Sequence, residues 1–124
     1  MFSEKVIKLF DKPKNVGIIK CASGSGASGS VEAGQLIKIY LKIEDDVVKD
    51  ARYKAYGGVL TIASCSALTT MIVGMSLDKV KLVTCEDVLA ELDMQNDSFC
   101  NEIDVCIDAL ISALSEYYKN QLEK

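Results

Sequence analysis

Residues 51–74 read as a strand, a tight turn and a buried helix that follow one another directly. Residues 52–56 alternate polar and apolar side chains, which is typical of a strand with one buried face. Gly57 and Gly58 come next, and glycine allows turns that a residue with a Cβ would resist. Residues 60–73 are apolar and rich in small side chains, which predicts a buried helix. Such a sharp strand-to-helix turn holds its residues at a fixed position, where functional groups are often found.

The strands are expected in the first half of the chain. Ile18 and Ile19 should begin the first strand, whereas the Gly/Ser/Ala-rich residues 21–30 that follow have little reason to become ordered. Residues 36–43 alternate well, and their predicted core face consists of Ile37, Ile39, Leu41 and Ile43. Residues 44–46 should form a turn, after which residues 47–56 return as an antiparallel partner, with Tyr53 and Lys54 on opposite faces.

Helices are expected at both ends of the chain and after the Gly-Gly turn. Ser3 can cap a first helix that runs through Phe10, with an apolar stripe of Val6, Ile7 and Phe10, and Pro13 follows it. Beyond Gly74, Ser76 should cap a short helix over residues 77–82, and Thr84 with Asp87 should form a capping box for residues 86–92. The last helix should run from about Ser98 towards Gln121, and its apolar stripe consists of Ile103, Ile107, Leu110, Ile111 and Leu114.

This order predicts a single α+β domain over residues 1–124, in which a small antiparallel sheet of about three strands is covered by helices on one face. One core should unite the two layers. Its expected members are Ile37, Ile39, Leu41, Tyr53 or Ala55, Ile107, Leu110 and Leu114.

Composition excludes several classes of function. The chain has no histidine, so Ser-His and Cys-His catalytic pairs and histidine metal sites are excluded. The net charge of −4, with acids and bases interspersed, argues against a nucleic-acid partner. No apolar run reaches the ~20 residues that a membrane span needs, and no signal peptide opens the chain, so we expect a cytoplasmic protein. The five cysteines form no C-x-x-C pair, and we expect no disulfide framework.

The run ARYKAYGGVLTIASCS, residues 51–66, resembles a motif of the NifU/IscU family of iron–sulfur cluster scaffold proteins, roughly A-R-F-K-x-[FY]-G-C-x-x-[AS]-I-A-S-[SA]-S. The N-terminal residues 2–7 and 13–17 are similar to the family's Y-S-E-K-V and N-P-x-N-V-G segments. Residues 26–35 are similar to G-x-x-G-x-P-x-C-G-D, and residues 87–92 to D-I-A-x-x-L. The resemblance covers nearly the whole chain and implies the same SufE/NifU-like α+β fold.

The family's ligand positions are substituted in this chain. By the resemblance, the first ligand cysteine falls on Ala33, the ligand-assisting aspartate on Gln35, and the cysteine of the Gly-Gly turn on Gly58. Near the family's H-C-S motif the alignment slips by a residue or two, so either Cys100 keeps the last thiol or Asn101 or Glu102 replaces it. The family's proline-rich L-P-P-V-K segment is absent.

The resemblance therefore implies a divergent, non-enzymatic scaffold-like protein of iron–sulfur cluster assembly with impaired cluster binding. Cys100 is the one candidate ligand for a cluster or for iron, and a single thiolate falls short of the four soft ligands that a [2Fe–2S] cluster normally takes. We expect none of this cargo to be bound as purified. Expected partners are a cysteine desulfurase or other assembly proteins, and the chain itself could form a homo-oligomer. Two alternatives remain open, namely a non-catalytic module that docks a desulfurase or a complete scaffold, and a SufE-like sulfur acceptor through Cys100.

The cysteines differ in their expected environments. Cys100 opens or precedes the last helix, whose dipole favours a thiolate, so it is the candidate for the most reactive thiol, and packing as a small apolar side chain is the equal alternative. Cys65 should pack in the buried helix and Cys106 in the core or at its edge. Cys85 follows the cap Thr84, and Cys21 begins the Gly/Ser segment with no activating neighbour.

Overall fold

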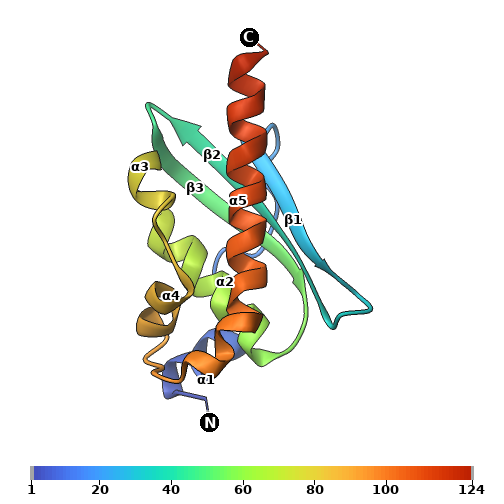
Figure 1. Ribbon diagram of the computed structural model, residues 1–124, viewed down its shortest axis with the longest axis vertical. Coiled ribbons are helices and arrows are strands. Elements are labelled where there is room, and N and C mark those ends of the chain that lie inside the picture. The colour runs from blue at the N-terminus through green and yellow to red at the C-terminus, as the bar shows by residue number, and fades with distance from the viewer. Residues whose placement is uncertain (1, 124) are drawn as a thin grey trace.

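The computed structural model describes residues 2–123 as an antiparallel sheet with helices packed against one of its faces (Figure 1). The strands β1, β2 and β3 form a meander in the order β1-β2-β3, and both pairs are antiparallel. The elements in chain order are α1 (Glu4–Asp11), β1 (Gly24–Ser30), β2 (Gln35–Glu44), β3 (Val47–Tyr56), α2 (Val59–Ile72), α3 (Leu77–Val80), α4 (Cys85–Glu91), the 3₁₀ turn η1 (Asp97–Phe99) and α5 (Cys100–Leu122). The predicted α+β fold is confirmed.

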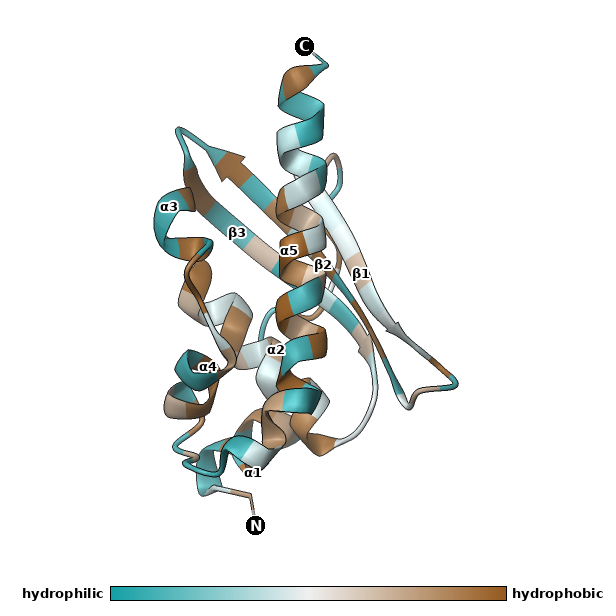
Figure 2. Ribbon diagram, in the orientation of Figure 1, coloured by the Kyte–Doolittle hydropathy of each residue, from teal (hydrophilic) through white to brown (hydrophobic). Residues whose placement is uncertain are grey.

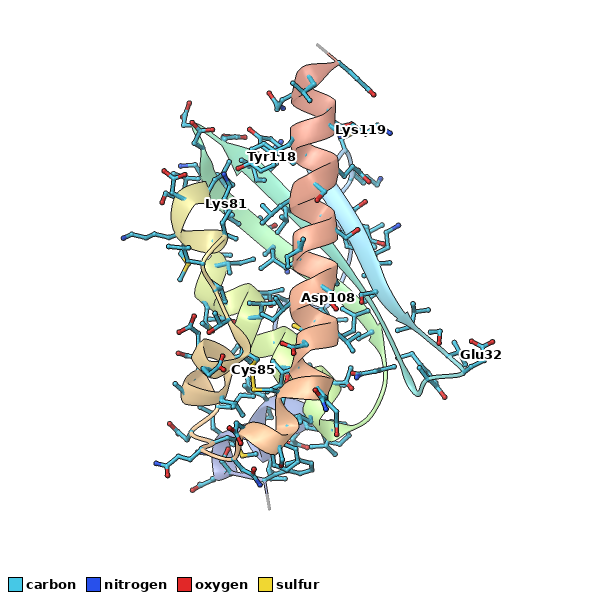
Figure 3. The ribbon with its side chains drawn as sticks, viewed as in Figure 1. Glu32, Lys81, Cys85, Asp108, Tyr118 and Lys119 are labelled. Atoms are coloured by element: carbon cyan, nitrogen blue, oxygen red, sulfur yellow. A yellow bond between two sulfur atoms is a disulfide. The ribbon has the colours of Figure 1, made fainter. Side chains whose placement is uncertain are left out.

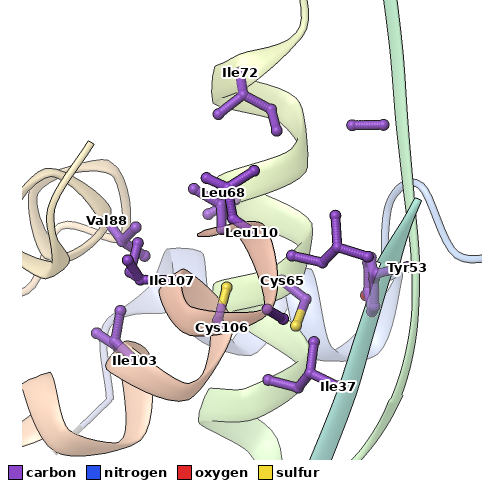
Figure 4. Packing of buried hydrophobic residues seen from close by; sticks show 14 of the residues in the cluster. Ile37, Tyr53, Cys65, Leu68, Ile72, Val88, Ile103, Cys106, Ile107 and Leu110 are labelled. Atoms are coloured by element: carbon purple, nitrogen blue, oxygen red, sulfur yellow. The ribbon is translucent and has the colours of Figure 1, made fainter. Parts of the chain in front are cut away.

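The core lies between the sheet and the helices α2 and α5 (Figure 4). Alternation in β2 turns Ile37, Ile39 and Leu41 fully into it, whereas Lys38 between them is exposed. In β3, Tyr53 is 1% exposed and Ala55 is only partly buried, so Tyr53 is the larger contributor of the two. The helical members of the predicted core, Ile107, Leu110 and Leu114, are buried as expected.

Strand β1 is the main departure from the sequence-based expectation. The Gly/Ser segment, which we expected to lack order, is an edge strand that pairs with β2 over residues 24–30. Its glycines explain why: a Cβ on Gly24 would lie 2.3 Å from the carbonyl oxygen of Ala113, and one on Gly26 would lie 2.3 Å from the amide nitrogen of that residue. Small residues therefore let α5 lie directly across the strand (Figure 1), and hydropathy gives no sign of this because β1 is pale in Figure 2.

The first strand does not begin at Ile18 and Ile19, which was the expectation. Ile18 is exposed, and the preceding residues instead join the outer edge of β3, where Tyr53 donates its backbone N–H to the Asn15 carbonyl and accepts one from Gly17. This short parallel bridge covers part of an edge that would otherwise remain unpaired.

The helices α1, α3 and α4 begin where their caps predict. Ser3, Ser76 and Thr84 cap α1, α3 and α4, and Thr84 with Asp87 forms the expected capping box. The apolar stripe of α1 is partly different from the prediction, because Val6 and Leu9 are buried while Ile7 and Phe10 are exposed. The long α5 likewise buries the predicted stripe except for Ile111, which faces solvent.

Candidate functional site

Gln35 joins three elements at one end of the sheet. Its side-chain amide donates from Nε2 to the backbone carbonyl of Glu102 in the first turn of α5, at 3.3 Å. Its Oε1 accepts a hydrogen bond from the Thr61 hydroxyl in the first turn of α2, at 2.9 Å. Because Gln35 is the first residue of β2, one side chain ties the start of a strand to the starts of both core helices.

Gly58 lies next to this junction as the N-cap of α2. Its φ of −86° is one that any residue adopts, and a Cβ built on it would meet nothing within 4 Å. Gly57 differs, because a Cβ there would lie 2.6 Å from the Thr61 hydroxyl oxygen. The turn thus needs glycine at position 57 because a side chain has no space there. Neither Gly57 nor Gly58 has a positive φ, so the backbone conformation itself does not require glycine. Position 58 has room for a longer side chain.

Ala33 lies in the β1–β2 turn, one residue from Glu32 at the hairpin tip in Figure 3. Its side chain is exposed, and its amide donates to the Ser30 hydroxyl at 3.1 Å. Gly34, with a φ of +91°, then turns the chain towards Gln35. The hairpin therefore carries Ala33 and Gln35 on one short connection.

The side chains of Cys100 and Glu102 point away from the axis of α5 in different directions. Residues two apart on a helix are about 200° apart around its axis, so they point to opposite sides. Val105, one turn on from Glu102, lies on the side of β1, where a Cβ on Gly29 would lie 3.1 Å from it. The Cys100 sulfur instead is joined to that of Cys85 at the start of α4. The structure therefore brings Gln35 and Glu102 together, and it brings Cys100 to a different neighbour.

The Cys85–Cys100 disulfide is a pairing that the sequence pattern, from which we expect no disulfide framework, does not predict. The two Cα atoms lie 5.5 Å apart because the first residue of α4 meets the first residue of α5. A sequence separation of 15 carries no such information, and only the predicted helix starts could have hinted at it. In this state Cys100 has no free thiol, so the expected reactivity of Cys100 concerns the reduced protein.

The remaining cysteines are free thiols. Cys65 and Cys106 are fully buried between α2 and α5 (Figure 4), as expected for Cys65, and Cys106 lies in the core rather than at its edge. A hydrogen bond with Cys65, together with burial, raises the pKa of the Cys106 thiol well above its usual range. Cys21 is exposed. The Cys106 thiol therefore stays protonated, and both core cysteines act as packing groups.

The junction around Gln35 has the chemistry of a hydrogen-bonding site. Of the residues matched to the family's ligand positions, Ala33 presents a methyl group, Gln35 an amide and Gly58 no side chain, and Asn101 and Glu102, two of the three candidates for the last position, present an amide and a carboxylate. Iron–sulfur clusters bind thiolates, which none of these groups supplies. Among residues 2–123, no helix combines the length and the apolar character that crossing a bilayer requires.

Comparison with known proteins identifies the class. The family model of the NifU-like N-terminal domain matches residues 1–124, so the chain belongs to this family. The IscU iron–sulfur cluster assembly scaffold protein of Escherichia coli strain K12 is 33% identical over 120 residues, which cover 94% of this chain and 93% of that protein.

Two further comparisons agree. The nitrogen fixation protein NifU of Cereibacter sphaeroides is 40% identical over 86 residues, which cover 69% of this chain but only 35% of the relative. The crystal structure of an N-terminal NifU-like protein from Brucella abortus superposes with a TM-score of 0.79 over 94% of both chains, at 14% identity. This last likeness shows the shared fold.

Proposed function

We propose that this protein works in iron–sulfur cluster assembly as a scaffold-family member whose own cluster site has lost its ligands. Support for the assembly role comes from family membership and from the IscU scaffold of Escherichia coli, which matches at nearly full length. Cluster or iron is the cargo of such a protein, and the scaffold role is not that of a classical enzyme.

The observation that carries the proposal is that both polar ends of the Gln35 side chain are engaged in hydrogen bonds within the protein. At the position where the family has a ligand-assisting aspartate, the amide uses both of its ends, one on Thr61 and one on the Glu102 backbone. An aspartate is one methylene shorter, and its carboxylate has no N–H to donate to the Glu102 carbonyl. The hydrogen bonds of Gln35 thus stabilise the junction of β2, α2 and α5, so that in this chain a structural connection takes the place of the ligand-assisting carboxylate.

Glu102 is the residue that we assign to the last family ligand position. It lies at the Gln35 junction, whereas Cys100 points to α4 and its sulfur is bonded there. The site then holds an alanine, a glycine and a glutamate in place of three cysteines. A carboxylate is a poor match for iron in a thiolate-type site, so the cargo would be held weakly or not at all.

Partners follow from the same proposal. If the protein keeps the family's docking surface but not the cluster ligands, that surface suits a cysteine desulfurase or a complete scaffold. A homo-oligomer could bring two copies of the chain together in that assembly. The cytoplasm, where such scaffolds work, is the expected location.

Anaerobic reconstitution tests the proposal. The protein, as its Cys85→Ser variant so that the Cys85–Cys100 thiol pair cannot hold iron, is incubated with ferrous iron, cysteine and a cysteine desulfurase. The mixture is passed through a desalting column and assayed for iron and visible absorption, with a three-cysteine IscU as the control. We expect the control to retain iron with a thiolate-to-iron charge-transfer band and this protein to retain neither. A stoichiometric, stable band on this protein would overturn the lost-ligand proposal.

The assembly role has its own readout in the same mixtures. We expect the protein to co-elute with the desulfurase or with the three-cysteine IscU in size-exclusion chromatography. Absence of both complexes at micromolar concentrations would contradict the assembly role, whatever the result for iron.

A further inference from the structure

A second group of metal-binding atoms lies away from the Gln35 junction. One ligand atom each from Cys85, Glu86 and Cys100 falls within 4.8 Å of the others. Cys85 is 8% exposed and Cys100 is half-buried, so the two sulfurs lie at the edge of the core, whereas Glu86 is exposed. Figure 3 shows Cys85 where α4 faces the lower part of α5.

Local structure fixes the backbone at both sulfurs. The capping box of Thr84 and Asp87 sets the start of α4, with Thr84 donating its amide to Asp87 at 2.9 Å. On the other side, the Asn96 side chain accepts from the Ser98 amide at 3.0 Å and sets the turn η1 that leads into α5. The local hydrogen bonds on each side thus set the backbone of Cys85 and of Cys100, whose Cα atoms lie 5.5 Å apart.

We propose that the dithiol form of Cys85 and Cys100, together with Glu86, binds one divalent cation of the zinc class. Thiolates and carboxylates are ordinary zinc ligands, and three protein ligands with an open fourth position for water make a complete tetrahedral set. The carboxylate Oε2 of Glu86 already lies 3.2 Å from the Cys85 sulfur, which places the third ligand beside the first. The cation would link α4 to α5 at the place where the disulfide links them.

Metal and disulfide exclude each other at this site, because a sulfur in a disulfide is no longer a thiolate. Closing the disulfide takes two electrons and two protons from the dithiol, and oxidised glutathione can accept them to give two molecules of reduced glutathione. Metal binding to the dithiol releases the thiol protons to solvent. The site would therefore hold its cation only under reducing conditions.

Cobalt(II) is the probe for the test, because sulfur-to-cobalt charge transfer reports thiolate coordination directly. The full chain is reduced, freed of reductant under anaerobic conditions, and titrated with Co²⁺ and then with Zn²⁺. We expect one equivalent of Co²⁺ with a charge-transfer band, its displacement by one equivalent of Zn²⁺, and no band after oxidation of the wild type by oxidised glutathione. A reduced wild type without the band, or an oxidised one with it, overturns the proposal.

Variants locate the site. Cys85→Ser and Cys100→Ser should each weaken binding by more than the roughly 10–100-fold that loss of an outer-shell partner costs, and Glu86→Gln should weaken it while the thiolate band remains. Cys21→Ser is the control, because Cys21 is an exposed free thiol outside the group, and it should bind as the wild type does. Equal affinity in Cys100→Ser, or loss of binding in Cys21→Ser, contradicts the assignment. Circular dichroism checks each variant for folding, and the oxidised wild type tests the proposal without any substitution.

Discussion

Two buried serines in α2 show that the surroundings of a hydroxyl decide whether it stabilises or destabilises the fold. The Ser66 Oγ lies 2.7 Å from the Tyr53 hydroxyl and also accepts the Lys14 amide at 3.1 Å. The Ser64 hydroxyl, two positions earlier, is just as buried and has no partner within the described chain. A buried hydroxyl without a partner costs free energy, whereas a satisfied one contributes to stability.

These environments predict opposite effects of the same substitution. Ser66→Ala should lower the free energy of unfolding by about 1–3 kcal/mol, because it leaves the Tyr53 hydroxyl and the Lys14 amide without their partner. Ser64→Ala should leave stability unchanged or raise it by up to about 1 kcal/mol, because it removes an unpaired polar atom. Urea denaturation of both variants measures the two values. A larger loss in Ser64→Ala than in Ser66→Ala would contradict the hydrogen-bond assignment.

Tyr53 also predicts how stability changes in alkali. Burial is the main cause that raises its pKa from 10.0 to about 12, although the Ser66 hydrogen bond acts in the opposite direction. The unfolded chain therefore loses this proton near pH 10 while the folded chain keeps it. Stability should be unaffected by this group below pH 10 and should fall between pH 10 and 12, by up to about 1.4 kcal/mol per pH unit.

The matched control for this pH dependence is Tyr53→Phe, which keeps the ring and removes the ionising group. The variant should be less stable at neutral pH, and its stability should fall less steeply than that of the wild type between pH 10 and 12. Equal slopes in chemical denaturation at several pH values would show that Tyr53 ionises normally.

At the scale of elements, close approach between β1 and α5 depends on glycine. Gly26→Ser should lower the free energy of unfolding by about 1–3 kcal/mol, because its Cβ would overlap the α5 backbone at Ala113. Gly58→Ser is the matched substitution at an open position with a permissive backbone, where a serine N-cap should leave stability unchanged or raise it slightly. Thermal denaturation compares them. Equal losses in the two variants would contradict the different roles of these glycines.

The elements also show what the sequence could and could not predict. Strand β2 and the helices α2 and α5 follow from alternation and from apolar runs and stripes, which are local signals. Strand β1 could not be predicted in this way, because its order comes from pairing with β2 and from the backbone of α5, and neither contact leaves a hydrophobic pattern in a Gly/Ser segment. The family motifs matched Ala33, Gln35 and Gly58 to ligand positions. The contacts of Gln35 and the pairing of Cys85 with Cys100 required tertiary structure.

At the scale of the whole molecule, the family fold is retained, and we propose that the chemistry at the family's ligand positions has changed. The sheet, the buried α2 and the crossing α5 keep the Gln35 junction in place without any thiolate at it. Position 58 is open, position 33 is exposed, and Glu102 lies in the first turn of α5. The backbone should therefore accept cysteines at these three positions without rearrangement.

Iron retention by a chain with restored thiols tests the central claim most directly. The triple variant Ala33→Cys/Gly58→Cys/Glu102→Cys is compared with the wild type and with the matched triple serine variant, all in a Cys100→Ser background, after anaerobic reconstitution and desalting. The account predicts a thiolate-to-iron charge-transfer band and retained iron in the cysteine variant, and neither in the serine variant or in its parent. A folded cysteine variant that retains no more iron than the serine variant would contradict the claim that the family site is intact except for its ligands.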